Sequence, residues 1–170
     1  VVQRHGGYRA GAFPEDYELW LRWLDAGVRM AKVPEVLLRW HDRPDRLSRT
    51  DSRYDLEAFY RLKATYLARW LRREVVPGRP IVVWGAGRLT RRRVEMLQRE
   101  GVEVAAYVDV ASRRQGTHRD GRVVWSPEDP RLTPERFVLG YVASRGARDL
   151  QREHLTRRGF VEGRDFLFAA

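Results

Sequence analysis

The stretch Ile81-Val82-Val83-Trp84-Gly85-Ala86-Gly87 decides the fold of the second half of this sequence. Four consecutive apolar residues that end in a glycine turn are typical of a buried parallel strand that leads into a helix. A helical pattern follows, in which Leu89, Val94 and Leu97 would face inward, and Gly101 stops it. The sequence therefore predicts a strand, a tight turn and a helix in direct succession.

Further apolar runs repeat this alternation toward the end of the chain. We expect strands at residues 102–108, 122–125 and 137–142, an edge strand at residues 165–168, and a helix that ends near Arg158. Strands that alternate with helices form a parallel sheet with right-handed crossovers. The predicted fold class is thus α/β, with a small Rossmann-like parallel-sheet domain over residues 81–170.

The glycine turn is also a candidate ligand site. Gly85 and Gly87 follow the strand, Arg88 comes next, and Thr90 stands where a dinucleotide fingerprint has its third glycine. Backbone N–H groups and the helix dipole at such a turn suit a phosphate. A tight turn needs glycine even when nothing binds, so a degenerate scaffold is the open alternative.

Three more residues are expected at the same edge of the sheet. Asp109 ends the next strand, close to the position of the acid that holds a ribose hydroxyl in dinucleotide sites. Ser144 and Arg145 follow the third strand and should reach the same crevice. These residues predict nucleotide binding, although the size of the domain and Thr90 argue against a working NAD dehydrogenase.

A linker separates this domain from the residues before it. The chain has 170 residues, which is enough for one ordinary domain or two small ones. The segment Val75-Val76-Pro77-Gly78-Arg79-Pro80 holds two prolines and a glycine, which cannot continue a helix. We therefore expect a first domain over residues 1–74 and a linker over residues 75–80.

The first domain is predicted to be mainly helical. Pro14, Glu15 and Asp16 suit the first turn of a helix, which Gly27 would end. Apolar residues on several sides of this helix suggest that it is largely buried. We further expect two short strands and one long helix, at residues 28–32, 36–40 and 53–73.

Composition excludes several classes of protein. The chain contains no cysteine, which excludes disulfides and thiolate chemistry, and no apolar run approaches the ~20 residues that span a bilayer. The net charge of +10 would suit nucleic acid, but the positive charge is nearly all arginine and is interleaved with acids in both halves. We therefore do not expect specific nucleic-acid binding. The sequence leaves the oligomeric state open.

One stretch resembles a known enzyme family. Gly6-Gly7-Tyr8-Arg9 is followed by Pro14-Glu15-Asp16-Tyr17-Glu18-Leu19-Trp20-Leu21-Arg22, and then by Pro34-Glu35-Val36-Leu37-Leu38, Arg39-Trp40-His41 and Ser48. In this order and spacing the motifs resemble the acceptor-side, C-terminal part of family 2 glycosyltransferases of the GT-A fold. The resemblance covers about residues 1 to 50.

This resemblance implies roles for three residues. Asp16 would be the base that takes the proton of the acceptor hydroxyl during inverting transfer, with Glu15 beside it. A divalent metal, Mg or Mn, would neutralise the leaving diphosphate in the complete enzyme, and His41 would contact that metal or the diphosphate. The alternatives are helix capping for the two acids and a surface or packing role for His41.

The sequence departs from the family in one respect. It contains no D-x-D motif, and it starts at Val1 without an initiator Met or a signal peptide, so we expect a fragment that does not transfer sugar alone. Its partners would be a nucleotide-sugar, a glycan acceptor and the missing N-terminal half. The motif VVWGAG…VAAYVDV resembles small Rossmann-like domains of bacterial polysaccharide-biosynthesis proteins. These resemblances imply a cytoplasmic location, with peripheral association with the inner face of the membrane as an open alternative.

Overall fold

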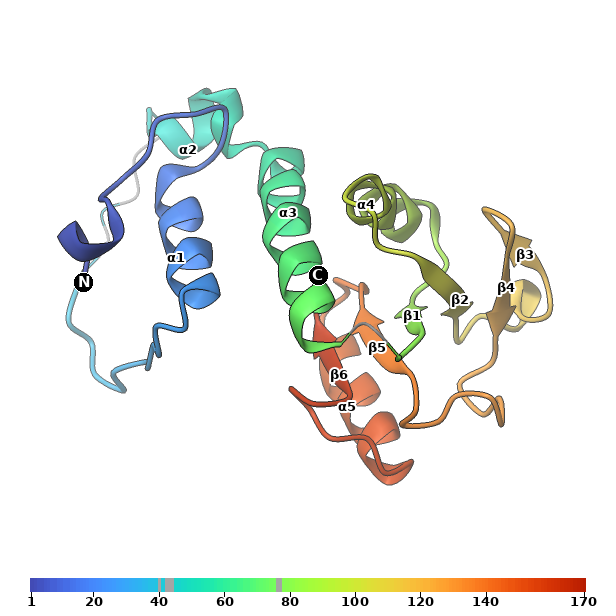
Figure 1. Ribbon diagram of the computed structural model, residues 1–170. Helices are drawn as coiled ribbons and strands as arrows, with labels where there is room; N and C mark the ends of the chain where they lie inside the picture. Colours follow the sequence, from blue (N-terminus) through green and yellow to red (C-terminus); the bar gives the residue numbers. More distant parts are fainter. Residues whose placement is uncertain (40, 42–44, 76–77) are drawn as a thin grey trace. The chain divides into compact units, whose positions relative to one another are not determined.

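The computed structural model describes residues 1–39, 41, 45–75 and 78–170. The chain forms two compact units, Val1–Trp70 and Leu71–Ala170. Their boundary lies within helix α3 (Leu56–Glu74), ahead of the predicted linker, of which Val76 and Pro77 lie outside the described residues (Figure 1). None of the helices in the described ranges is long and apolar enough to cross a bilayer.

The first unit is helical in its described part. Before α3, its elements are η1 (Gln3–His5), α1 (Glu15–Asp25), α2 (Leu47–Thr50) and η2 (Ser52–Tyr54). The strands predicted at residues 28–32 and 36–40 are wrong for every described residue of these ranges, which is turn or irregular; Trp40 lies outside them. A strand needs a neighbour for its backbone N–H and C=O groups, and the described part of this unit offers none.

Helix α1 is also less buried than predicted. Leu19 and Glu18 are buried, but Trp20 and Leu24 are each about half exposed, at 49% and 52%. Leu37 is 73% exposed in the segment that follows α1. Apolar spacing alone therefore overestimated how much of this helix is covered.

The second unit is a six-stranded sheet flanked by helices. Its strands are β1 (Ile81–Trp84), β2 (Val104–Val108), β3 (His118–Arg119), β4 (Arg122–Trp125), β5 (Phe137–Gly140) and β6 (Phe166–Phe168). The order across the sheet is β3-β4-β2-β1-β5-β6, and every neighbouring pair is parallel except β3 with β4. Helix α4 (Arg88–Arg99) links β1 to β2, η3 (Ser112–Arg114) follows β2, and α5 (Ala147–Arg157) links β5 to β6. The predicted Rossmann-like α/β fold is confirmed.

One strand was not predicted. β3 and β4 form a hairpin in which His118 pairs with Val123. Its two-residue loop is Asp120-Gly121, and both residues have positive φ, at 50° and 74°. An Asp-Gly pair at positive φ is the preferred chemistry of a two-residue hairpin turn, so this strand had a readable local signal.

The two faces of the sheet pack against different helices. Val82 and Trp84 share a buried cluster with Leu155 of α5. Side chains alternate along a strand, so Val83 points to the other face, and right-handed crossovers place α4 there. Val94 and Leu97 of α4 are fully buried as predicted, whereas Leu89, predicted to face inward, is exposed.

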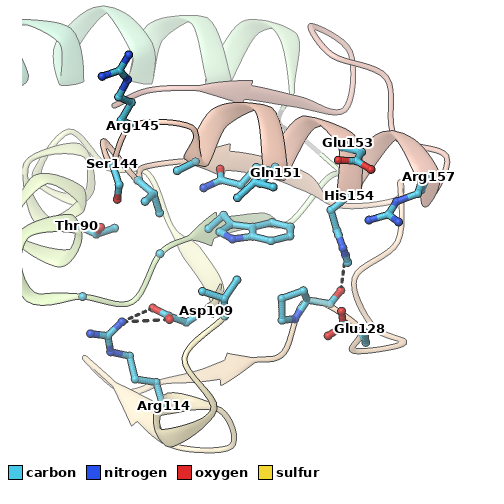
Figure 2. A pocket seen from close by; sticks show the side chains of 18 residues that line it. Thr90, Asp109, Arg114, Glu128, Ser144, Arg145, Gln151, Glu153, His154 and Arg157 are labelled. Atoms are coloured by element: carbon cyan, nitrogen blue, oxygen red, sulfur yellow. Dashed lines mark hydrogen bonds and ion pairs between the residues drawn. The ribbon is translucent and has the colours of Figure 1, made fainter.

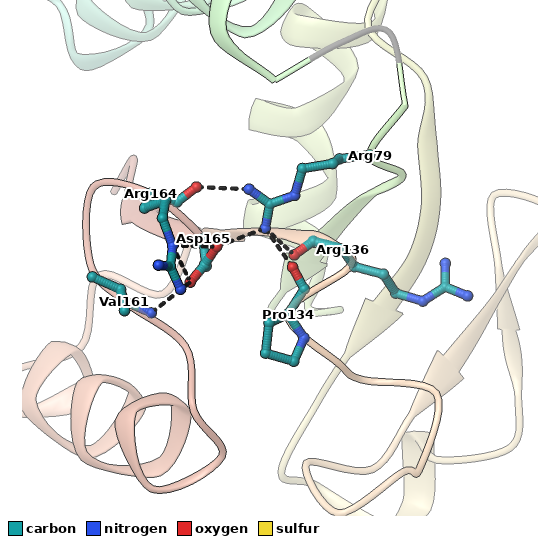
Figure 3. A network of polar contacts seen from close by, with 6 residues as sticks. All are labelled: Arg79, Pro134, Arg136, Val161, Arg164 and Asp165. Atoms are coloured by element: carbon teal, nitrogen blue, oxygen red, sulfur yellow. Dashed lines mark hydrogen bonds and ion pairs between the residues drawn. The ribbon is translucent and has the colours of Figure 1, made fainter.

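An ion-pair network around the buried carboxylate of Asp165 fixes the amino ends of β1, β5 and β6 (Figure 3). The guanidinium of Arg79, just before β1, donates to the carbonyls of Pro134 at 2.6 Å, Arg136 at 3.1 Å and Arg164 at 2.8 Å. It also pairs with the buried carboxylate of Asp165 at 2.9 Å, and Arg164 pairs with the same carboxylate at 2.8 Å. One arginine therefore joins the segments that precede β1, β5 and β6.

Asp165 is held ionised by these contacts. Burial alone would raise the pKa of its carboxyl, but donation from Arg164, from the Val161 N–H at 2.8 Å and from Arg79 outweighs burial, and the pKa lies below its usual value. A carboxylate with a lowered pKa in the folded state stabilises the fold above its unfolded pKa of about 4. That contribution is lost as the pH falls through the folded pKa.

We predict that Asp165→Asn lowers the free energy of unfolding at pH 7 by about 2 kcal/mol, because both arginines then face a neutral amide. Urea unfolding from pH 7 down to pH 3 measures this. The difference in the free energy of unfolding between parent and variant should become smaller as the pH falls. Asp149→Asn is the control, because Asp149 is an exposed acid paired with Arg152 and should change stability little. A gap that stays constant with pH would contradict this account.

Candidate functional site

A cavity lies at the carboxyl edge of the second unit, where the order of the strands reverses. From the central β1 the chain adds β2 and β4 on one side and then crosses to β5 and β6 on the other. Crevices of this kind, outside the carboxyl ends of the strands at a switch point, are where open α/β sheets bind ligands. The cavity has a volume of about 630 Å³ and is lined by segments that follow β1, β2, β4 and β5 (Figure 2). Its size suits a small ligand.

Gly85 is required by the shape of the turn, because the protein leaves no room for a side chain at this position. Its φ is +117°, and a Cβ there would lie 2.9 Å from Val142 Cγ2 and 3.0 Å from Thr90 Oγ1. Thr90 is buried, and its hydroxyl donates to the Tyr141 carbonyl at 3.2 Å. Thr90 therefore takes the place of the third glycine by linking α4 to the end of β5.

Gly87 is different. Its φ of −70° suits any residue, and a Cβ at this position would meet nothing within 4 Å. Gly87 lines the cavity and is the N-cap of α4, without a side-chain capping bond. The N-terminus of α4 therefore lies at the cavity, where backbone N–H groups of a helix's first turn have no intrahelical partner.

Asp109 lies where the sequence placed it, but its carboxylate is already occupied. Oδ2 accepts from the Ala86 N–H at 2.8 Å, and Oδ1 accepts from the Ala111 N–H at 2.9 Å. Arg114 Nη1 lies 3.1 Å from Oδ1 and 2.9 Å from Oδ2. The side chain is buried, so the carboxylate ties the turn after β1 to the loop after β2. This geometry is that of a structural support, and a ribose hydroxyl would have to displace Arg114.

Of the other predicted ligand residues, two line the cavity and one does not. Ser144 and Arg145 line the cavity, as expected from their position after β5. Arg88 is exposed at the start of α4 and does not line it. The structure thus brings Gly85, Gly87, Asp109, Ser144 and Arg145 to one edge.

Helix α5 supplies a wall that sequence reasoning missed. Ala147, Leu150, Gln151, His154 and Arg157 all line the cavity. Their spacing of three and four residues puts them on one face of a helix, and the polar members of that face were the available signal.

His154 and Arg158 hold the loop that follows β4, which forms another wall of the cavity. The ring of His154 lies edge-on to Trp84, with centroids 5.2 Å apart, and its Nε2 is 3.0 Å from the Pro127 carbonyl. The guanidinium of Arg158 donates to the carbonyls of Pro127, Asp129 and Leu132 at 2.8–2.9 Å. Pro127 and Glu128 are thereby fixed as lining residues.

In the first unit, Glu15 is engaged by a tyrosine. The Tyr54 hydroxyl lies 2.7 Å and 2.6 Å from the two carboxylate oxygens. This hydrogen bond lowers the pKa of Glu15 and raises the pKa of Tyr54 to about 12. Glu15 is thus an ionised acid with a fixed orientation.

Asp16 has a different environment. It lies in the first turn of α1, is partly exposed, and its Oδ1 accepts from the Tyr17 N–H at 2.7 Å. Within the described residues no arginine or lysine pairs with it. Its carboxylate therefore retains acceptor capacity.

Glu18 and Arg22 organise the start of α1, a role that the sequence analysis did not assign. Glu18 is buried and accepts from Arg22 Nη2 at 2.9 Å and from the Tyr66 hydroxyl at 2.7 Å. Burial raises the pKa of Glu18, but these bonds outweigh it and the pKa is lowered. Arg22 also donates to the carbonyls of His5 and Gly7. The Glu–Arg spacing of four residues on a helix was the sequence signal.

His41 is exposed, and its neighbours Trp40 and Asp42 lie outside the described residues. Among the residues that the structure does describe, no three His, Cys, Asp or Glu side chains come together in a way that could hold a metal ion. The described residues therefore do not fit a protein-held divalent cation.

Comparison with known protein families, with curated proteins and with solved structures finds no match for this chain.

We predict that Asp109→Asn lowers the free energy of unfolding by about 2 kcal/mol without any ligand, because it weakens the bonds of a buried carboxylate to the partly exposed guanidinium of Arg114 and to two backbone N–H groups. Chemical unfolding of the ligand-free protein measures this. Asp120→Asn is the matched control: Asp120 is an exposed partner of Arg91 at positive φ, which asparagine tolerates. If Asp109 served only to hold ribose, both variants would be as stable as the parent.

Proposed function

We propose that this chain is the acceptor-side part of an inverting glycosyltransferase that moves a sugar from a nucleotide-sugar to a glycan or glycoconjugate. One observation carries the proposal: Asp16 has an available carboxylate at the start of α1, while its neighbours Glu15 and Glu18 are fixed by Tyr54, Tyr66 and Arg22. A general base needs this combination of a free acceptor atom and a fixed surrounding. We place this activity in the cytoplasm, with peripheral association with the inner face of the membrane as the alternative.

In this proposal Asp16 accepts the proton of the acceptor hydroxyl as that oxygen attacks the anomeric carbon and the bond to the leaving diphosphate breaks. Glu15 stays ionised beside it. Its hydrogen bond to the Tyr54 hydroxyl connects the first turn of α1 to η2. No step is assigned to a metal, because the described residues do not supply a ligand set. The sequence contains no D-x-D, so we do not expect transfer by these residues alone.

We predict that Asp16→Asn lowers kcat about 10²–10⁴-fold in a polypeptide that joins these residues to a nucleotide-sugar half with D-x-D, because the amide cannot accept the proton. Transfer of labelled sugar measures this, with circular dichroism to verify folding. Glu57→Gln, an exposed acid in the first turn of α3, is the control and should keep parental activity. Parental rates for Asp16→Asn, or a reading frame upstream of Val1 that encodes no such half, would count against the transferase.

A second function is supported by a separate observation in the second unit. The switch-point cavity combines an uncapped helix N-terminus at Gly87 with a buried Gln151 whose Oε1 has no partner among the described residues. The helix dipole at this N-terminus favours an anion in the cavity, and Arg145, which lines the cavity, forms no ion pair within the described residues. On this basis we propose the second unit as a non-catalytic nucleotide-binding or regulatory module.

We predict that a nucleotide or nucleotide-sugar raises the unfolding temperature of the 170-residue chain. At a concentration about 100 times its Kd, binding adds about 2.7 kcal/mol, which corresponds to a rise of about 5–10 °C. Thermal unfolding with UDP-sugars, GDP-sugars and NAD(P) measures this, with sodium chloride at equal ionic strength as the control. If none of these compounds raises the unfolding temperature, the second unit is a structural scaffold and the proposed binding module is wrong.

A further inference from the structure

We propose that residues 35–39 of the first unit form an interface with a second copy of this chain, in which the two segments pair as antiparallel strands around Leu37. The inference is independent of the transferase and of the ligand-binding module. It gives a partner to a segment whose sequence predicts a strand but which forms none in the described part of the chain.

The segment Glu35-Val36-Leu37-Leu38-Arg39 exposes three consecutive aliphatic side chains. Val36 is 91% exposed, Leu37 is 73% exposed and Leu38 is 71% exposed. Single apolar residues scattered over a surface are normal, whereas apolar residues that lie together at a surface mark sites of interaction. The three side chains therefore indicate a surface that another molecule covers.

The backbone of this segment is unpaired as well. Residues 36–39 belong to no helix or strand, and within the described residues residues 35–39 form no backbone hydrogen bond. An extended segment with free N–H and C=O groups can pair with a strand of another molecule. Pro34 has no N–H to donate, so it limits such a ladder at its amino end.

The order of the side chains suits a pair of two identical antiparallel strands. When Leu37 lies opposite Leu37 of the second copy, Val36 lies opposite Leu38 and Glu35 lies opposite Arg39. Side chains alternate along a strand, so the acid–base pairs share one face with Leu37, and the Val36–Leu38 pairs occupy the other. Both ends of the ladder thus carry opposite charges, and every aliphatic side chain meets another one.

Other arrangements of the same two segments match less well. A parallel pair in register would place Glu35 opposite Glu35 and Arg39 opposite Arg39, and like charges directly opposite each other are destabilising. A shift of the antiparallel register by one residue would place a charge opposite an aliphatic side chain. Glu35 and Arg39 are both exposed, and neither has an ion-pair partner within the described residues. Charge complementarity therefore selects the antiparallel pair centred on Leu37.

The second unit offers a poorer match for this segment. Within residues 78–170, the sheet ends at β3 (His118–Arg119) on one side and at β6 (Phe166–Phe168) on the other. These edge strands have two and three residues, and neither contains both an acid and a base. A second copy of residues 35–39 provides a partner of equal length with both charges.

Sedimentation velocity of the 170-residue chain between about 5 and 500 µM tests whether the chain self-associates. We expect a reversible equilibrium between monomer and dimer with a Kd of about 10–100 µM, because a two-stranded ladder is only marginally stable.

Cysteine cross-linking tests which residues meet. The chain contains no cysteine, so a single introduced thiol reports on one position. Leu37→Cys would place two thiols opposite each other, with Cβ atoms about 4.5–5.5 Å apart, and mild oxidation should give a disulfide-linked dimer. Val33→Cys is the matched control. Val33 is 51% exposed, but it precedes Pro34, and this register places its two copies at opposite ends of the ladder.

Charge reversal tests the acid–base pairs. Glu35→Lys and Arg39→Glu each create two contacts between like charges in a dimer, so each variant alone should self-associate at least about tenfold more weakly than the parent. A mixture of the two variants should regain the parental affinity, because opposite charges then meet at both ends of the ladder. Both residues are exposed, so the unfolding temperature of each variant should equal that of the parent.

Cross-linking through Leu37→Cys alone, together with association that the mixture restores, would establish the interface. A chain that stays monomeric over the whole concentration range would overturn it and leave the segment to a different partner. Equal cross-linking of both cysteine variants would indicate unspecific aggregation, and a mixture that fails to associate would contradict the antiparallel register. Either of these results also overturns the inference, and the transferase and the ligand-binding module do not depend on the outcome.

Discussion

The carboxylate of Asp109 is the constraint on which the candidate site depends. It is buried, and it accepts hydrogen bonds from Ala86, Ala111 and Arg114 at 2.8–3.1 Å. Burying a carboxylate is costly unless it is paired and hydrogen-bonded, and here the contacts join the turn after β1 to the loop after β2. The glycine turn after β1 and the loop after β2 are therefore held at a fixed separation, and the cavity between the turn and α5 keeps its shape without a ligand.

The same arrangement recurs at two other places in the chain. Asp165 receives Arg79, Arg164 and a backbone N–H at the amino edge of the sheet, and Glu18 receives Arg22 and Tyr66 in the first unit. In each case a buried acid collects donors from separate segments and keeps a lowered pKa in spite of its burial. Part of the large excess of arginine is thus used in intramolecular bonds to carboxylates and carbonyls.

The two proposed functions depend on different units. One requires an acidic side chain that is available, and the other requires one whose hydrogen bonds are already made within the protein. In the first unit Asp16 matters because its carboxylate is available, whereas its neighbours are engaged. In the second unit Asp109 matters because it is fully engaged and holds the turn after β1 to the loop after β2. Position along the sequence did not separate these roles, because an acid at a helix start or a strand end fits either one.

The sequence by itself determined the sheet. The apolar runs that became β1, β2, β4, β5 and β6 carry a local pattern, and Asp120-Gly121 would have revealed β3. It also determined that Gly85, Gly87, Asp109, Ser144 and Arg145 share one edge, since parallel strands end together. Tertiary structure alone decided that Asp109 is occupied, that the buried Gln151 Oε1 has no partner in the described part of the chain, and that residues 28–39 form no strand. Those outcomes depend on which hydrogen-bond donors and strands from distant parts of the sequence lie next to these residues. The local periodicity of the sequence does not encode such partners.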